Sequence, residues 1–118
     1  MSKEPIDYLR HISDECHYLE NAVGDNLSKE HFLEDATLKR AFVRSLEVIG
    51  EATKNIPADF KIKWGAINWK NMAGMRDRLI HDYLGVNYSI VWDVVKNKIP
   101  ELSRQVDEII RAETDLCI

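Results

Sequence analysis

The sequence predicts an all-α fold, an antiparallel helical bundle of four to five helices in a single domain over residues 1–118. Apolar residues recur at steps of three and four along most of the chain, which is the period of a buried helix face. Gly24, Pro57 and Gly85 fall between these runs, where helices start and stop. No two runs alternate apolar and polar residues around a hairpin turn, so the pattern favours helices throughout.

The first predicted helix starts near Ile6 and ends near Gly24. A polar stretch follows, in which Ser28 offers an N-cap for one or two helical turns over residues 29–33. The first helix is amphipathic because its apolar residues recur on one face. That face consists of Ile6, Leu9, Ile12, Cys16, Leu19 and Val23.

A second long helix starts near Asp35 or Thr37 and is stopped by Pro57, which cannot continue a helix. Gly50 lies inside this helix at a cost of about 1 kcal/mol relative to alanine, so we expect another backbone to pack closely there. The predicted buried face comprises Leu38, Ala41, Phe42, Ser45, Val48, Ile49 and Ala52.

Residues 57–68 form a predicted connector with a short helical turn near residues 59–63. A third helix begins near Asn68 and runs through Leu79. After it, Asn87 or Ser89 caps a fourth helix.

Pro100 fits the first turn of a fifth helix, where its missing N–H is no loss. The β-branched residues near 90–99 favour strands when taken alone. Because no second run pairs with them at period two, we predict helix there as well.

The formal net charge is −4, which argues against a surface that binds nucleic acid everywhere. The charge is unevenly divided. Residues 39–78 carry nine Lys or Arg against four Asp or Glu, a balance of +5, whereas residues 1–38 carry three against nine and residues 79–118 carry four against seven. This division suits a local site for an anionic ligand, although helices that differ only in surface charge fit it equally well.

No apolar run approaches the roughly 18 residues that span a bilayer, and the polar N-terminus lacks a signal-peptide core. We therefore expect a cytoplasmic protein without membrane association. Cys16 and Cys117 stand in no metal-ligand spacing, so reduced thiols are expected.

The third predicted helix carries the most informative pattern in the chain, in which Arg76, Asp77 and Arg78 precede His81 and Tyr83. A guanidinium can hold a phosphodiester through two parallel hydrogen bonds, and an imidazole with a pKa of about 6.5 can transfer protons near neutral pH. These groups are the parts needed for RNA cleavage without a metal ion.

Helical geometry separates the two central groups, because positions five apart differ by about 140 degrees around an unbroken helix. Arg76 reaches His81 only if its side chain bends round the helix, if the helix loosens before His81, or if a second subunit completes the site. Asp77 lies four residues before His81, a spacing at which a carboxylate can orient the imidazole. Tyr83 returns to the side of Arg76 after nearly two turns.

Arg76, His81 and Tyr83, in the spacing Arg-x4-His-x-Tyr, resemble the signature of HEPN-domain proteins of the HepT toxin type, the small partners of minimal nucleotidyltransferases (MntA). Further segments agree, so the resemblance runs from about residue 5 to residue 110. These segments are residues 44–52, 69–83, 91–93 and 99–102.

The resemblance implies a HEPN-like bundle that forms a homodimer and joins two Arg-His motifs in one cleft. It implies a metal-independent endoribonuclease of a type VII toxin–antitoxin system, with RNA as substrate and no cofactor. His81 is then the acid or base, Arg76 stabilises the developing phosphorane charge and Asp77 positions His81. Tyr83 is the implied acceptor of AMP groups from the MntA-type antitoxin, an AMPylation that silences the toxin.

Several residues fit more than one interpretation. Arg44 and Arg78 suit RNA phosphate contacts and suit surface ion pairs equally. Glu47 and Glu51 share a helix face, where paired carboxylates do acid/base work or, more often, form ion pairs. The tryptophans Trp64, Trp69 and Trp92 are expected in the core or in an interface rather than as base-stacking platforms.

Two further function classes remain open. The histidines His11, His17 and His31 form no metal triad, so no metal site is predicted. The net acidity supports an alternative function, a non-catalytic helical subunit that binds and positions a minimal nucleotidyltransferase. A nucleotide-binding regulator that uses the Arg-His-Tyr pocket is a third, weaker possibility.

Overall fold

The computed structural model describes residues 4–79 and 85–115, apart from the side chain of Arg76. The described residues form eight helices and no strand, which confirms the predicted all-α class. The helices are α1 (Pro5–Val23), α2 (Lys29–Glu34), α3 (Ala36–Lys54), α4 (Ala58–Lys63), α5 (Trp69–Ala73), α6 (Met75–Leu79), α7 (Tyr88–Asn97) and α8 (Ile99–Asp115).

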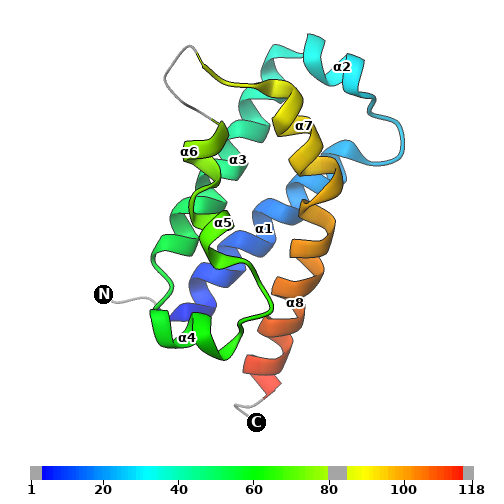
Figure 1. Cartoon of the computed structure of the whole chain (residues 1–118). Coiled ribbons are helices and arrows are strands. Elements are labelled where there is room, and N and C mark those ends of the chain that lie inside the picture. The colour runs from blue at the N-terminus through cyan, green and yellow to red at the C-terminus, as the bar shows by residue number, and fades with distance from the viewer. Residues whose placement is uncertain (1–3, 80–84, 116–118) are drawn as a thin grey trace.

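The helices form an antiparallel bundle of four columns (Figure 1). α1 runs through the centre and packs against both α3 and α8, which run in the opposite direction. The short helices α5 and α6 together form the third column, which packs against α3. α7 is followed directly by α8, and these two helices form the fourth column. α2 and α4 lie in the connections. None of the helices in the part of the chain described here is both long and apolar enough to cross a membrane.

Local signals in the sequence place most helix ends. Ser28 accepts a hydrogen bond from the backbone N–H of His31 (3.1 Å), and Asp35 caps α3 in the same way through Leu38 (2.9 Å). α1 ends at Gly24, whose φ of 51° and ψ of −144° favour glycine. The predicted starts and stops of the first two long helices are therefore confirmed.

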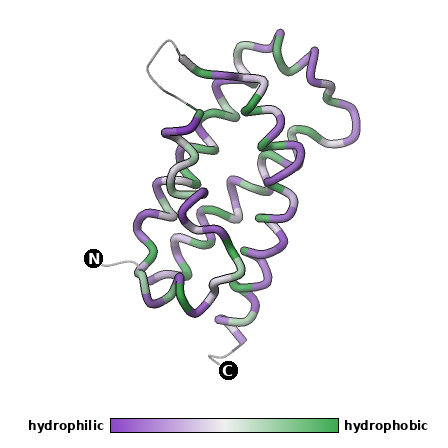
Figure 2. Tube along the Cα trace, in the orientation of Figure 1, coloured by the Kyte–Doolittle hydropathy of each residue, from purple (hydrophilic) through white to green (hydrophobic). Residues whose placement is uncertain are grey.

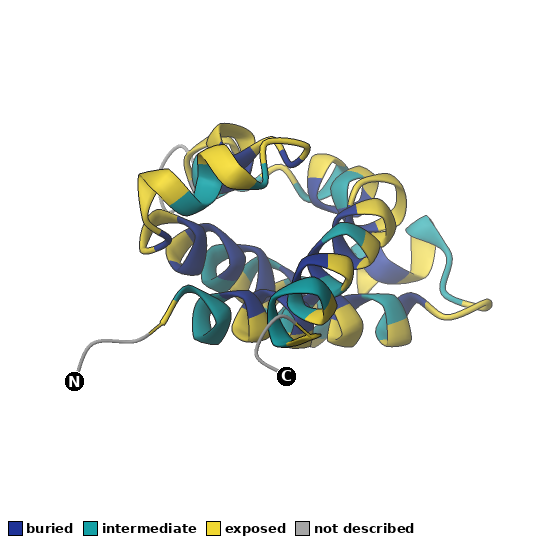
Figure 3. Cartoon of the chain, turned by 90° about the horizontal axis from the view of Figure 1, so that it is seen from below, coloured by how far each residue is buried: buried dark blue, intermediate teal, exposed yellow. Residues whose placement is uncertain are grey.

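The core lies between the columns, where the apolar faces of the helices meet (Figures 2 and 3). Phe32 of α2 packs on Phe42 of α3 and on Trp92 of α7, with ring centroids 4.9 and 5.5 Å apart. These aromatic contacts fix the short helix α2 to the bundle. The predicted face of α3 omitted Leu46, which is 1% exposed and belongs to the core.

The predicted third helix is corrected to two helices. α5 ends at Gly74, whose N–H donates to the carbonyl of Lys70 (3.0 Å), and α6 begins at Met75. Glycine is a weak helix former, costing about 1 kcal/mol relative to alanine, so the helix breaks where the sequence places one. The prediction of one continuous helix from Asn68 to Leu79 is therefore wrong.

The second half otherwise follows its predicted signals. Residues 58–63 form α4 inside the connector, and Trp69 and Trp92 are buried as expected. The side chain of Asn87 accepts from the N–H of Ile90 (3.2 Å) and caps α7. Pro100 is the second residue of α8, and the β-branched run before it is helical because tertiary packing overrides its strand preference.

Candidate functional site

The predicted motif begins on α6. The backbone of Arg76 belongs to this helix, and Asp77 and Arg78 are exposed on it. The side chain of Arg76 and the whole of His81 and Tyr83 lie outside the described residues. The spatial relation of Arg76 to His81 and Tyr83 therefore stays a prediction.

The position of α6 is set by the connector before it. The indole N–H of Trp69 donates to the carbonyls of Lys61 and Trp64, each at 3.1 Å. The side chain of Asn68 caps α5 by accepting from the N–H of Asn71 (3.0 Å). Both α5 and α6 then pack against α3. A buried tryptophan and a cap thus hold the column that carries the motif.

Contacts of the bundle also fix the chain on either side of residues 80–84. Leu79, the last residue of α6, is buried, and its carbonyl accepts from the N–H of Asn87 (3.4 Å) just before α7. The ammonium group of Lys39 lies 4.8 Å from the ring centroid of Tyr88, which ties the start of α7 to α3. The last residue of α6 and the residue before α7 are thus held together at one place.

Two arginines that were predicted as phosphate contacts have different surroundings. Arg44 is exposed, and its Nη1 lies 3.7 Å from Oε2 of Glu47 on the same helix. For both Arg44 and Glu47, a surface ion pair was the alternative to a functional role in the sequence analysis, and the structure shows this pair. Glu51 is exposed one turn further along. Arg78 instead lines a groove of about 450 Å³ beside α6.

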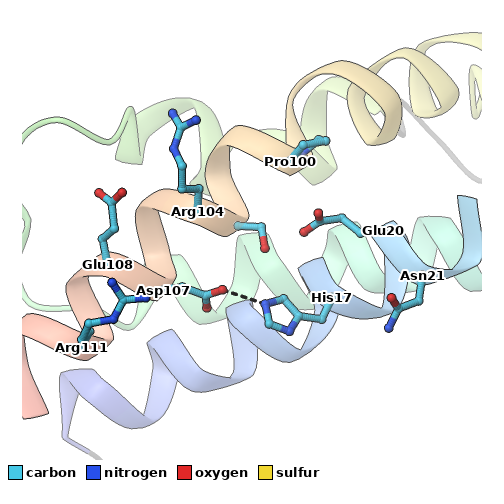
Figure 4. Close-up of a pocket in the computed structure, with 9 residues that line it drawn as sticks. His17, Glu20, Asn21, Pro100, Arg104, Asp107, Glu108 and Arg111 are labelled. Atoms are coloured by element: carbon cyan, nitrogen blue, oxygen red, sulfur yellow. Dashed lines mark hydrogen bonds and ion pairs between the residues drawn. The ribbon is translucent and has the colours of Figure 1, made fainter. Parts of the chain in front are cut away.

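A second polar cluster was missed by the sequence reasoning. His17 of α1 and Asp107 of α8 point toward one another, with Nε2 and Oδ2 2.8 Å apart (Figure 4). Ser13 donates to the other carboxylate oxygen of Asp107 at 2.6 Å. His17 and Asp107 line a hollow of about 470 Å³ between the two helices. Members that stand 90 residues apart leave no local signal in the sequence.

The environment of His17 favours its charged form. The hydrogen bond to Asp107 raises the pKa of His17, and the charges of Asp107, Glu20 and Asp14 act in the same direction. A histidine held by a carboxylate can act as a general acid or base. Arg104 points away from the pair, whereas Arg111 lines the same hollow with its guanidinium on the side of Asp107 (Figure 4).

Two further titratable groups have shifted pKa values for structural reasons. Burial is the main reason that the pKa of Cys16 rises to about 12, so this thiol is not reactive near neutral pH. Glu113 accepts from Lys63 (2.9 Å) and from the Trp64 indole (2.7 Å), and these hydrogen bonds lower its pKa. No group of three or more His, Cys, Asp or Glu residues within residues 4–79 and 85–115 could hold a metal ion.

Sequence comparisons relate this chain to proteins named as ribonucleases. A family model described as "Ribonuclease HepT-like" matches residues 6–109. A protein named "Putative RNase" from Caldanaerobacter subterraneus subsp. tengcongensis is 52% identical over 111 residues, covering 94% of this chain and 98% of the relative. "Probable ribonuclease HepT" from Thermococcus cleftensis is 40% identical over 109 residues, covering 92% and 98%. No solved structure matches.

Proposed function

We propose, since this chain belongs to the HepT-like ribonuclease family, that it is a metal-independent endoribonuclease centred on Arg76 and His81. The observation that carries the proposal is the family match over residues 6–109, a range within which Arg76, His81 and Tyr83 lie. The tie between Leu79 and Asn87 supports it, because it anchors the motif segment on both sides.

The proposed reaction is an internal transesterification of RNA. The ribose 2′-hydroxyl loses its proton and its oxygen bonds to the adjacent phosphorus, while the bond from phosphorus to the 5′-oxygen breaks. The leaving 5′-oxygen takes up a proton, which yields a 2′,3′-cyclic phosphate and a free 5′-hydroxyl. His81 performs one proton transfer, and the motif of a second protomer in the homodimer performs the other.

The remaining motif residues have supporting roles in this proposal. Arg76 stabilises the charge that develops on the phosphorane. Asp77 positions His81 and favours its protonated form. Arg78, exposed on α6 two residues after Arg76, contacts a neighbouring phosphate.

We further propose that the activity belongs to a type VII toxin–antitoxin system and that Tyr83 is its control point. An MntA-type nucleotidyltransferase antitoxin transfers AMP to the Tyr83 hydroxyl, with release of pyrophosphate from ATP. The added phosphate and nucleoside place negative charge and bulk beside Arg76 and His81. The added phosphate then repels the RNA backbone, and the added nucleoside blocks the space that RNA would occupy.

Cleavage of RNA by the purified protein in EDTA tests the mechanism. Arg76→Ala and His81→Ala should each lower the rate by at least about 100-fold, because each removes a group that acts only in the transition state. His17→Ala is the matched control, because it removes a histidine that also pairs with a carboxylate, that of Asp107, but lies outside the proposed motif. Its rate should stay within about twofold of the wild type.

Three outcomes contradict parts of this proposal. Full activity of a folded His81→Ala protein refutes the assigned acid or base. Loss of activity in His17→Ala alone moves the chemistry to the hollow between α1 and α8. Intact RNA across tRNA and mRNA substrates favours the alternative that the net charge of −4 supports, a non-catalytic subunit that binds a minimal nucleotidyltransferase.

Intact-mass analysis tests the modification separately. The protein is produced together with an MntA-type nucleotidyltransferase, and its mass should rise in steps of one AMP unit. Tyr83→Phe is the control and should keep its unmodified mass, because it lacks the acceptor oxygen. AMP found on Tyr88 or another tyrosine refutes the assignment of Tyr83.

A further inference from the structure

A groove of about 450 Å³ lies beside the helix that carries Arg76. One wall is formed by α5 and α6, and the other by α7 and the start of α8. Met75, Arg78 and Leu79 line the groove from α6, so three of that helix's five residues face it. Its volume falls within the roughly 300–1,000 Å³ of typical ligand sites.

The floor of the groove is apolar. Met72, Leu79 and Leu102 are buried side chains that reach its surface from three different helices. Ile90 of α7 lines it as well and is 43% exposed. Binding of a flat, weakly hydrated group over this apolar floor and the exposed isoleucine is favourable, because it removes apolar surface from water.

The rim of the groove is polar and positive. Arg78 and Lys98 are exposed cations, and neither has an ion-pair partner among the residues that the structure describes. Asn71 and Gln105 add amide groups that can donate and accept. Glu101 is the one carboxylate in the lining, which leaves a balance of +1 in a chain of net charge −4.

We propose that this groove is a subsite for one unpaired nucleotide of single-stranded RNA, next to the cleaved phosphodiester. The base lies on the apolar floor, the amides of Asn71 and Gln105 bond to its edge, and Arg78 and Lys98 hold the flanking phosphates. Duplex RNA cannot enter, because its bases are paired and stacked within the helix. The inference rests on the proposed ribonuclease function and adds a preference for unpaired RNA.

Fluorescence anisotropy with a labelled 2′-O-methyl oligoribonucleotide of about ten nucleotides tests the subsite. This probe lacks the attacking hydroxyl, so it binds without being cleaved. The wild-type protein should bind an unstructured probe at least about tenfold more tightly than a fully paired duplex of the same length.

Lys98→Glu should weaken binding of the unstructured probe about tenfold, because a phosphate contact becomes a repulsion. Lys96→Glu is the matched control. Lys96 is also exposed and lies on α7, but it does not line the groove. The same change of charge there should alter affinity less than about twofold at equal salt concentration.

Ile90→Ala tests the apolar floor and should weaken binding about threefold to tenfold. Ile62→Ala, on α4 and 81% exposed away from the groove, should leave binding unchanged. In cleavage assays Lys98→Glu and Ile90→Ala should raise KM more than they lower kcat, because they act on binding rather than on proton transfer.

Equal effects of Lys98→Glu and Lys96→Glu overturn the subsite, while wild-type cleavage in the same preparation leaves the proposed function intact. A wild-type protein that neither cleaves RNA nor binds the probe overturns both. Sedimentation velocity tests whether a second copy of the chain, rather than RNA, occupies the groove. If Ile90→Ala converts a wild-type dimer to monomer, the groove is covered by a second copy of the chain and the subsite is refuted.

Discussion

A histidine–aspartate pair that the structure shows and one that the sequence predicts differ in how far apart their members stand in the sequence. His17 and Asp107 are separated by 90 residues, and the packing of α1 against α8 brings them to 2.8 Å. Asp77 and His81 are separated by four residues, and their pairing is predicted from helical spacing alone. A local pair can be proposed from the sequence, whereas a distant pair is found only when the fold is known.

The regions that hold the two pairs also differ in their packing. α1, α3 and α8, which we call the frame, have 17 to 19 residues each and carry most of the fully buried side chains. α5 and α6, which we call the motif column, have five residues each and are divided at Gly74. The frame is therefore expected to determine global stability, and the motif column to contribute less per residue.

The largest expected effect comes from truncating the frame. Leu46→Ala on α3 should lower the free energy of unfolding by about 2–5 kcal/mol, because Leu46 is fully enclosed and its loss leaves a cavity. Met75→Ala on α6 removes a side chain of similar size that is only half-buried, and should cost less than half as much. Urea denaturation measures both. Equal losses contradict the division into frame and motif column.

A smaller effect is expected at the C-terminal end of the frame helix α1. Gly24 ends α1 with φ 51° and ψ −144°, so Gly24→Ala should cost about 1–3 kcal/mol of strain. Gly65, in the connector that leads to the motif column, is the control. A Cβ there meets only the Ile62 carbonyl at an ordinary 3.5 Å, so Gly65→Ala should change stability by less than about 1 kcal/mol. Similar losses at both positions refute the assignment of strain to Gly24.

The fold could be predicted where its signals are local. The caps at Ser28, Asp35 and Asn87, together with Pro100, set helix ends through bonds to residues within one turn, so the sequence alone places them. The break at Gly74 was missed because a single glycine is compatible with a continuous helix until packing decides.

The candidate site could be predicted only in its local part. The spacing of Arg76, His81 and Tyr83 is visible in the sequence, and all three residues lie within the range that the family model matches. The groove beside α6 depends on α5, α6, α7 and α8 at once, and no periodicity records which helices become neighbours. The same holds for the contact of His17 with Asp107.

The smallest expected effect concerns His17 on the frame helix α1. The hydrogen bond to Asp107 raises the pKa of His17 above its unfolded value of about 6.5. Its contribution to stability is therefore fully present below pH 6.5 and is lost as the pH rises through the folded pKa. Since the pair is largely exposed, we expect a pH-dependent part of about 0–1 kcal/mol.

His17→Gln should remove this pH dependence while keeping a side chain that can still donate to Asp107. Urea denaturation between about pH 5.5 and about pH 8.5 should show the wild type losing its advantage over the variant as the pH rises. His31→Gln, on an exposed histidine of α2, is the control and should give a constant difference. A wild-type advantage that grows with pH means that the neutral imidazole, rather than the cation, is the form that α1 and α8 stabilise between them.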